Sequence, residues 1–127
     1  MIPKPADNVT DLLQKFLDVQ TRRAEVISSN IANADTPGYR AKELDFGSYL
    51  REAARQSVLP GAERENALVS TPRVIERESE AIGFDGNTVD AGKEMAELAE
   101  AGSNFSFGAK MLQSRLRLLR SAIREGR

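Results

Sequence analysis

Two stretches of apolar residues, spaced in alternating steps of three and four, lie at opposite ends of the chain and constrain its fold most strongly. This is the heptad spacing of helices that pack along a seam. In the N-terminal stretch, where Gln20 is the one polar member, the seam comprises Leu13, Leu17, Ala24, Ile27, Ile31 and Ala34. A second stripe beside it consists of Val9, Leu12, Phe16 and Val19. The apolar face is therefore wider than a two-stranded coiled coil requires, and it could meet more than one neighbour.

The C-terminal stretch keeps the same alternation over four heptads. Its seam comprises Met95, Leu98, Gly102, Phe105, Ala109, Leu112, Leu116, Leu119 and Ile123. A helix from Asp90 to Arg124 would be about 50 Å long. Acidic residues near its start and arginines near its end complement the helix macrodipole. Gly102 and Gly108 each weaken the middle of this helix by roughly 1 kcal/mol relative to alanine, and they permit either close helix approach or local softness.

The segment between the two seams begins with a turn and continues with less regular structure. The first helix must end before Asp35, because Pro37 disfavours helix at Thr36 and Gly38 accepts the positive φ of a type II turn. A short amphipathic helix follows, capped by Asp45. Its apolar face comprises Phe46, Tyr49, Leu50, Ala53 and Ala54. Residues 58–84 lose helical periodicity, with extended pieces expected only at Ala67–Thr71 and Val74–Ile75.

These patterns predict a mainly α fold with a single domain over residues 1–127. We expect an N-terminal helix over 7–34, a turn, short helix and loop over 35–84, and a C-terminal helix over 85–127. The two long helices are expected to pack as an antiparallel, coiled-coil-like pair, and the loop-rich middle has room for a short β element. Periodicity alone leaves open whether the seams bury each other within a monomer or pack with other copies.

Composition argues against most enzyme chemistry. The chain contains no His and no Cys, so Ser-His and Cys-His nucleophiles, cysteine redox chemistry and the usual zinc sites are absent. Carboxylate-only or Ser-Lys catalysis has no supporting spacing. A calcium loop starting at Asp85 also fails, because its sixth and twelfth positions hold Asp90 and Ala96 where an EF-hand needs Gly and Glu. We therefore expect no catalytic residue, cofactor or metal, and a capped turn at 85–90.

Charge and hydropathy give little support for a nucleic acid or a membrane as the partner. The net charge is −1, and no run approaches the roughly 18 apolar residues of a membrane helix. The C-terminal arginines flank an apolar seam, and no aromatic residue lies among them to stack on bases. A helical nucleic-acid-binding module is therefore the weaker alternative. Residues 1–16 carry charges and prolines where a secretory signal would have an apolar core, so we expect no general secretory export.

One segment is more specific than the periodicity. As local structure it is a helix C-terminus followed by a polar turn, but the whole string is rare. Its distinctive residues are Ser29, Asn30, Asn33, Asp35, Thr36, Pro37, Gly38 and Tyr39. This string resembles the signature of the flagellar rod and hook family of axial proteins. Members of that family are helical at both termini and assemble around a hollow axis.

A second segment resembles the lead into the C-terminal helix of the proximal rod members of that family. It comprises Asp85, Gly86, Asn87, Thr88, Val89 and Asp90. The residues from Tyr39 to Phe46 are similar to the family's continuation after the turn, and the resemblance covers residues 9–57 and 85–124. The chain length agrees with a proximal rod protein, since hook and distal rod members carry large inserted β domains.

The resemblance implies a structural subunit of the proximal rod that polymerises through its terminal helices and helps to transmit torque. The implied partners are its own copies, other rod proteins, rotor ring and rod-base adaptor proteins, and the type III export apparatus. No nucleic acid or small-molecule substrate is expected. The implied location is the periplasm-spanning rod of the flagellar basal body, reached without a cleavable signal peptide. Another short proximal rod component is the close alternative.

Overall fold

The computed structural model describes residues 5–56, 71–79 and 84–126. Its elements in chain order are helix α1 (Pro5–Ala32), strand β1 (Lys42–Leu44), helix α2 (Phe46–Gln56), strand β2 (Val74–Glu76) and helix α4 (Ala91–Glu125). The architecture is mainly helical, with one two-stranded sheet in the middle, as the sequence predicts. None of the described helices is long and apolar enough to cross a membrane.

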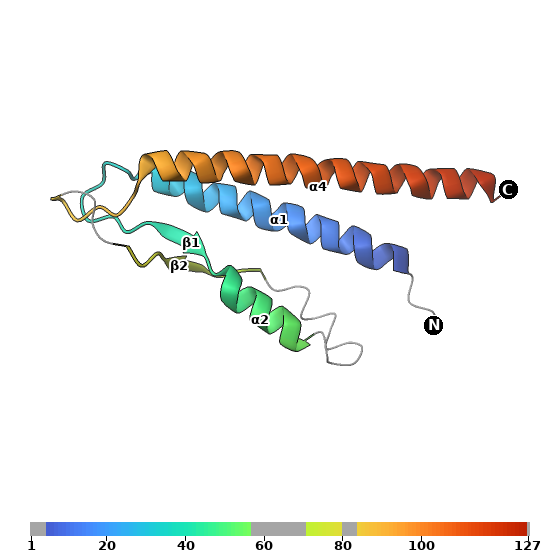
Figure 1. Cartoon of the computed structure of the whole chain (residues 1–127), viewed down its shortest axis with the longest axis horizontal. Helices are drawn as coiled ribbons and strands as arrows, with labels where there is room; N and C mark the ends of the chain where they lie inside the picture. The colour runs from blue at the N-terminus through green and yellow to red at the C-terminus, as the bar shows by residue number, and fades with distance from the viewer. Residues whose placement is uncertain (1–4, 57–70, 80–83, 127) are drawn as a thin grey trace.

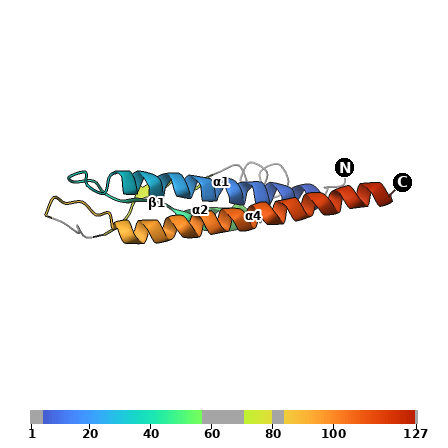
Figure 2. The ribbon, with the colours of Figure 1, turned by 90° about the horizontal axis from the view of Figure 1, so that it is seen from above.

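The two long helices pack side by side in antiparallel orientation (Figures 1 and 2), which confirms the predicted pair. With 28 and 35 residues, α1 and α4 are about 42 Å and 52 Å long. Helix α4 runs without interruption through Gly102 and Gly108. The C-terminal end of α4 extends past the first described turn of α1 (Figure 1). The pair therefore has two different ends. At one, α1 finishes and α4 begins; at the other lie the start of α1 and the C-terminal end of α4.

Helix α4 approaches α1 closely at Gly108. A Cβ atom at this position would lie 2.8 Å from Cδ1 of Phe16 and 3.0 Å from Cδ2 of Leu17. Contacts this short are not tolerated, so only glycine fits without movement of the α1 side chains. A Cβ at Gly102 would meet no atom within 4 Å. Close helix approach thus explains Gly108 and leaves Gly102 without a packing role.

The small sheet lies against the end of α1 where the chain turns back. Strands β1 and β2 are antiparallel, with Glu43 opposite Ile75. The sheet begins one residue past Ala41, whose carbonyl accepts the Arg77 N–H at 2.8 Å. The extended piece predicted at Val74–Ile75 is confirmed, whereas residues 67–70 of the other predicted piece lie outside the described residues.

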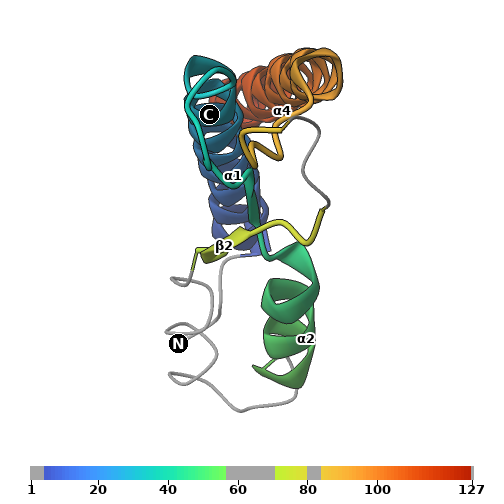
Figure 3. The same ribbon diagram turned by 90° about the vertical axis from the view of Figure 1, so that its left-hand side faces the viewer.

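Helix α2 starts where sequence reasoning placed it. The Asp45 carboxylate accepts the backbone N–H of Ser48 at 3.0 Å, which is the expected N-cap bond. From there α2 extends away from the α1–α4 pair (Figures 1 and 3). On its predicted apolar face Phe46 and Tyr49 are partly buried and Leu50 is exposed; the side chains of Ala53 and Ala54 lie outside the described set.

The core is small and sits where the sheet, the turn and both long helices meet. Its buried apolar side chains are Val26, Ile27, Ala41, Leu44, Val89 and Ala101. Several polar side chains are buried among them, which is unusual in so small a core. Buried polar groups require partners, and these partners define the candidate site.

Candidate assembly site

The turn after α1 has the geometry predicted from its sequence. Helix α1 ends at Ala32, before Asp35. The Tyr39 N–H donates to the Thr36 carbonyl at 3.2 Å across Pro37, and Gly38 has φ of +72°. This is the position at which a type II turn needs a residue with positive φ. The Asn33 side chain caps the helix end by donating to the Ser29 carbonyl at 2.8 Å.

The segment 85–90 before α4 is a capped turn. Oδ1 of Asp85 accepts the Asn87 N–H at 3.1 Å, and Oδ1 of Asn87 accepts the Val89 N–H at 2.8 Å. Gly86 has φ of +80°, and Asp90 caps α4 by accepting the Lys93 N–H at 3.2 Å. Asp90 thus precedes the helix as its N-cap, while the helix proper begins at Ala91. Among the described residues, no group of carboxylates is arranged to hold a metal ion.

These two turns, about fifty residues apart in sequence, bind each other through a set of hydrogen bonds that we term the joint. The Asn87 amide donates to the carbonyls of Asn33 at 2.9 Å and Thr36 at 2.8 Å. The Gly38 N–H donates to the Asp85 carbonyl at 2.8 Å. Thr88 binds on both sides: its N–H donates to the Tyr39 carbonyl at 3.0 Å, and its hydroxyl accepts the Ala41 N–H at 2.8 Å. The joint therefore fixes the start of α4 to the end of α1.

Asn30 links the joint to the sheet and to α4. Its side chain is fully buried, and all its hydrogen-bonding groups have partners. Oδ1 accepts the Lys42 N–H at 2.9 Å and the Tyr39 hydroxyl at 3.2 Å. The amide donates to the Lys42 carbonyl at 2.8 Å and to Oε2 of Glu94 at 2.9 Å. The position requires a side chain that both donates and accepts hydrogen bonds, and an asparagine amide does both. An ionised aspartate could not donate, and a leucine could do neither.

Glu94 and Arg77 form a buried ion pair that sequence reasoning missed. The Glu94 side chain is completely buried, and Nη1 of Arg77 donates to its Oε1 at 2.6 Å. The same guanidinium also donates to Glu43 at 3.1 Å and to Glu97 at 3.2 Å. Burial opposes the charge of Arg77, but the hydrogen bonds that it donates to Glu94 and Glu43, together with the negative charges of Glu94 and Glu97, outweigh burial and raise the pKa of the guanidinium. Strand β2, which leads into Arg77, is thereby fastened to α4.

The predicted seam lies along the margin of the contact between the two helices. On α4 the buried residues are Glu94, Ala101 and Gly108, one position before the seam residues Met95, Gly102 and Ala109. The seam residues that face α1 in part are Leu98, Ala109, Leu112 and Leu119. Those exposed in the single chain are Met95, Gly102, Phe105, Leu116 and Ile123. On α1, Ile27 is buried and the half-buried members are Leu13, Leu17, Ala24 and Ile31; Ala34, also half-buried, lies in the turn after the helix.

Apolar side chains are also exposed outside the seam. They include Val9, Leu12 and Phe16 on α1 and Phe107, Met111 and Leu118 on α4. Leu118 is 69% exposed and Leu12 is 54% exposed. Exposure of this many large apolar residues along two helices is typical of a surface that binds a protein partner. Fold and site together define a helical assembly subunit, ordered at one end by a polar joint and apolar on the surface at the other.

Comparisons with known proteins identify the class more closely. The profile of the family described as flagella basal body rod protein matches residues 17–40, which include the whole turn motif. Over most of their length, the chain resembles several proteins named flagellar basal body rod protein FlgB. The Aeromonas hydrophila protein is 32% identical over 124 residues, covering 93% of this chain and 94% of the relative. The Salmonella typhimurium protein is 30% identical over 129 residues, covering 89% and 91%.

The Cereibacter sphaeroides protein of the same name is 31% identical over 112 residues, covering 85% of this chain and 88% of the relative. The chain therefore belongs to the FlgB family of flagellar basal body rod proteins, and it is a structural subunit of the rod. The family assignment confirms the resemblance drawn from the turn motif and the lead into α4. The same matches favour membership of the FlgB family over the alternative, another short proximal rod component.

Proposed function

We propose that the chain polymerises through its terminal helices, with its own copies and with other rod proteins, to build the part of the rod that transmits torque. The observation that carries the proposal is the exposure of seam residues on α4. Phe105 is 42% exposed, Leu116 43% and Ile123 68% in the single chain. These residues keep strict heptad spacing although α1 does not cover them. Helices of adjacent subunits would bury them by the same packing that joins α1 and α4.

The further partners follow from this role. The rotor ring and rod-base adaptor proteins would bind the subunit at the base of the rod, and the type III export apparatus would deliver it without cleavage of a signal peptide. The subunit acts in the basal body by packing alone, without catalysis, cofactor, small-molecule substrate or nucleic acid. The rigid α1–α4 pair supports torque transmission, because the buried joint fixes one helix to the other.

The test places a charge in the exposed part of the seam. Leu116→Asp should abolish rod assembly and motility, since an aspartate buried between subunits without a partner is strongly unfavourable. The folding of the isolated chain should change little, because Leu116 is substantially exposed there. Motility is measured in a strain that lacks its own copy of the gene, and circular dichroism of the purified chain reports folding.

Ser114→Ala is the matched control two positions away. It removes one exposed hydroxyl and neither a charge nor an apolar contact, so motility should fall much less. Equal motility of the two variants would show that position 116 is not buried between subunits. Loss of helical structure in the isolated Leu116→Asp chain would show instead that Leu116 serves the fold.

A further inference from the structure

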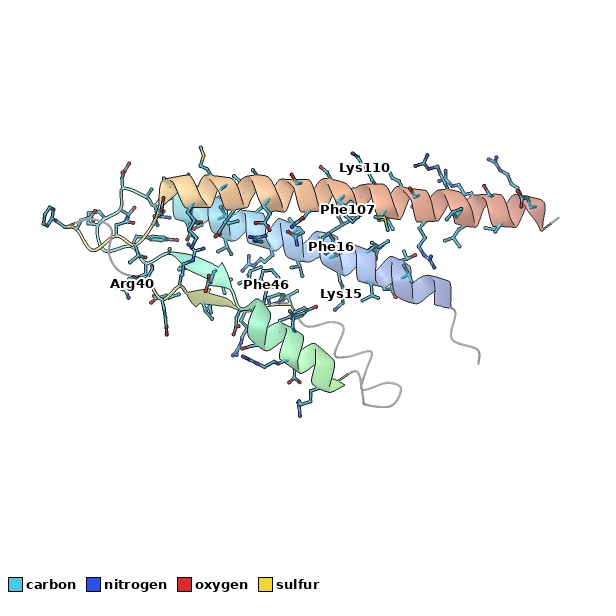
Figure 4. All side chains as sticks on the ribbon, viewed as in Figure 1. Lys15, Phe16, Arg40, Phe46, Phe107 and Lys110 are labelled. Carbon is cyan, nitrogen blue, oxygen red and sulfur yellow. The ribbon has the colours of Figure 1, made fainter. Side chains whose placement is uncertain are left out.

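The side of α4 turned away from α1 is basic, and an apolar flank lies beside it. The flank comprises Phe107 (64% exposed), Met111 (47%) and Leu118 (69%), each one residue and hence about 100° from a position that faces α1. Lys110, Arg117 and Arg124 lie on the outward side itself, each seven residues from the next. Leu112 and Leu119 face α1. Lys110 and Arg117 each precede one of them by two residues, which is about 200° around the helix, so these basic residues point away from α1. Figure 4 shows Lys110 projecting from the side of α4 away from α1. We term Lys110, Arg117 and Arg124 the basic edge.

The outward-facing side of α1 carries acidic residues with the same period. Asp11, Asp18 and Glu25 are each seven residues apart, and all three are exposed. Phe16 lies against α4 at Gly108, and Gln20 is buried, so both face α4. Asp18 is two residues from each of them, which is about 200° around the helix, and it therefore points away from α4. We term these three residues the acidic edge. The α1–α4 pair is therefore a ribbon with opposite charges on its two outer sides.

Neighbouring cations engage part of the acidic edge. Arg22 forms a salt bridge with Glu25 at 3.0 Å. Lys15 projects from α1 toward the side on which α2 lies (Figure 4). Within the described part of the chain, Asp11 and Asp18 form no salt bridge, and neither do the three residues of the basic edge. Asp11 and the three residues of the basic edge are thus available to a partner outside the chain, whereas Glu25 pairs with Arg22 and Asp18 interacts electrostatically with Lys15.

We propose that copies of this chain pack edge to edge in the rod, with the acidic edge of α1 in one copy against the basic edge of α4 in the next. This proposal rests on the proposed function and specifies its contact. Equal heptad spacing lets Asp11, Asp18 and Glu25 oppose Arg124, Arg117 and Lys110 in antiparallel register. Phe107, Met111 and Leu118 lie on the flank beside this contact. Exposed ion pairs are individually weak, but they select which surfaces meet and in which register.

The register also fixes how far one copy is displaced along its neighbour. Within a chain, Arg23 pairs with Glu100, so in the antiparallel pair Glu25 lies near the level of Leu98. Between chains, Glu25 would oppose Lys110, twelve residues farther along α4. One copy is therefore displaced by about 18 Å along the helix axis relative to the next. Because the two edges differ, the contact is heterologous, and repetition of a displaced heterologous contact builds an open helical array.

The absence of cysteine from the chain gives a direct test. Asp18→Cys and Arg117→Cys are combined in one chain, which replaces the cell's own subunit, and isolated basal bodies are treated with a short bis-maleimide. We expect a covalent species of twice the chain mass, containing a peptide that links residues 18 and 117. The link must join two copies, since these residues lie on opposite outer sides of the pair.

Asp18→Cys with Ser103→Cys is the matched control. Ser103 is also exposed and two residues from the buried Ala101, but it lies about 21 Å along α4 from Arg117. The 18–103 link should form at least tenfold less than the 18–117 link. Equal yields, a dominant 18–18 link, or no 18–117 link in assembled basal bodies would overturn the proposal.

Charge exchange provides a second readout that does not depend on reagent geometry. Asp18→Arg and Arg117→Asp should each reduce the number of assembled basal bodies severalfold, and the double exchange should restore most of them. A double variant no better than the single variants would contradict the pairing. The unvaried chain must restore motility in the same strain, and its failure to do so would refute the proposed function. Restored motility without an 18–117 cross-link would refute only the edge contact.

Discussion

The two ends of the α1–α4 pair are built in opposite ways. At the end where the chain turns back, polar side chains are buried and their hydrogen bonds are satisfied, with Asn30 and Glu94 fully inaccessible. At the other end, where both helices terminate, apolar side chains such as Leu12 and Ile123 are exposed. The sheet covers the helices at the first end, while α2 diverges from them toward the second (Figure 1). One end is therefore held together by polar contacts within the chain, and we propose that the apolar side chains exposed at the other contact neighbouring subunits.

The strongest way to break this contrast is to remove a buried charge at the joint end. Glu94→Ala should lower the free energy of unfolding by about 3–5 kcal/mol, because Arg77 would remain buried without its closest partner. Urea denaturation of the purified chain, followed by circular dichroism, measures the change. Glu43→Ala is the control, since Glu43 binds the same guanidinium but its side chain is 42% exposed. Its effect should stay below about 1 kcal/mol.

A similar loss of stability for the two glutamate variants would mean that burial at the joint does not distinguish Glu94. A small loss for both would contradict the idea that the polar network orders this end. Neither variant removes an exposed apolar residue, so these outcomes leave the assembly surface untouched. The experiment thus separates the order of the joint from the contacts of the free end.

A smaller effect is expected where the two helices cross. Gly108→Ala places a methyl group against Phe16 and Leu17 and should destabilise the chain by about 1–2 kcal/mol despite the better helix propensity of alanine. Gly102→Ala meets no neighbour and should stabilise the isolated chain by up to about 1 kcal/mol. Thermal unfolding of both variants compares them. Shifts of the same sign would show that the helices do not approach closely at Gly108.

The smallest expected effect concerns α2, which stands apart from both ends. The hydrogen bonds from Ser48 lower the pKa of the Asp45 carboxyl below its usual value. The capping contribution is therefore present above the unfolded-state pKa and is lost as the pH falls through the folded-state pKa. An NMR titration should show the Ser48 amide shifting over that range, whereas in Asp45→Asn the amide should remain unshifted. An unshifted Ser48 amide in the unvaried chain would contradict the cap.

Local structure was predictable because its causes lie close together in sequence. The two helices, the Asp45 cap and the positive φ of Gly38 follow from residues within a few positions of each element. The joint was not predictable in the same way. Asn87 was recognised only as part of a turn, and its bonds to Asn33 and Thr36 join segments that the sequence separates by about fifty residues.

The ion pair was missed for a related reason. In the sequence, Glu94 is one of the acidic residues near the start of a helix, and Arg77 lies in the stretch without helical periodicity. Only the pairing of β2 with β1, which lies against α1, brings Arg77 to Glu94. The apolar face of α4 is also wide enough that spacing does not define its centre, and the buried face is centred one position before the predicted seam. A wide face can serve two contacts, and sequence alone does not say which residues serve each.

A density map of the assembled rod, at a resolution that shows side chains, tests the division between the two ends most directly. We expect the joint to keep its hydrogen bonds, with Asn87 on the carbonyls of Asn33 and Thr36. Phe105, Leu116 and Ile123 should be buried against helices of adjacent subunits. A rod in which these three side chains face solvent, while the contacts between subunits are made by the joint, would contradict the assignment of assembly to the free end.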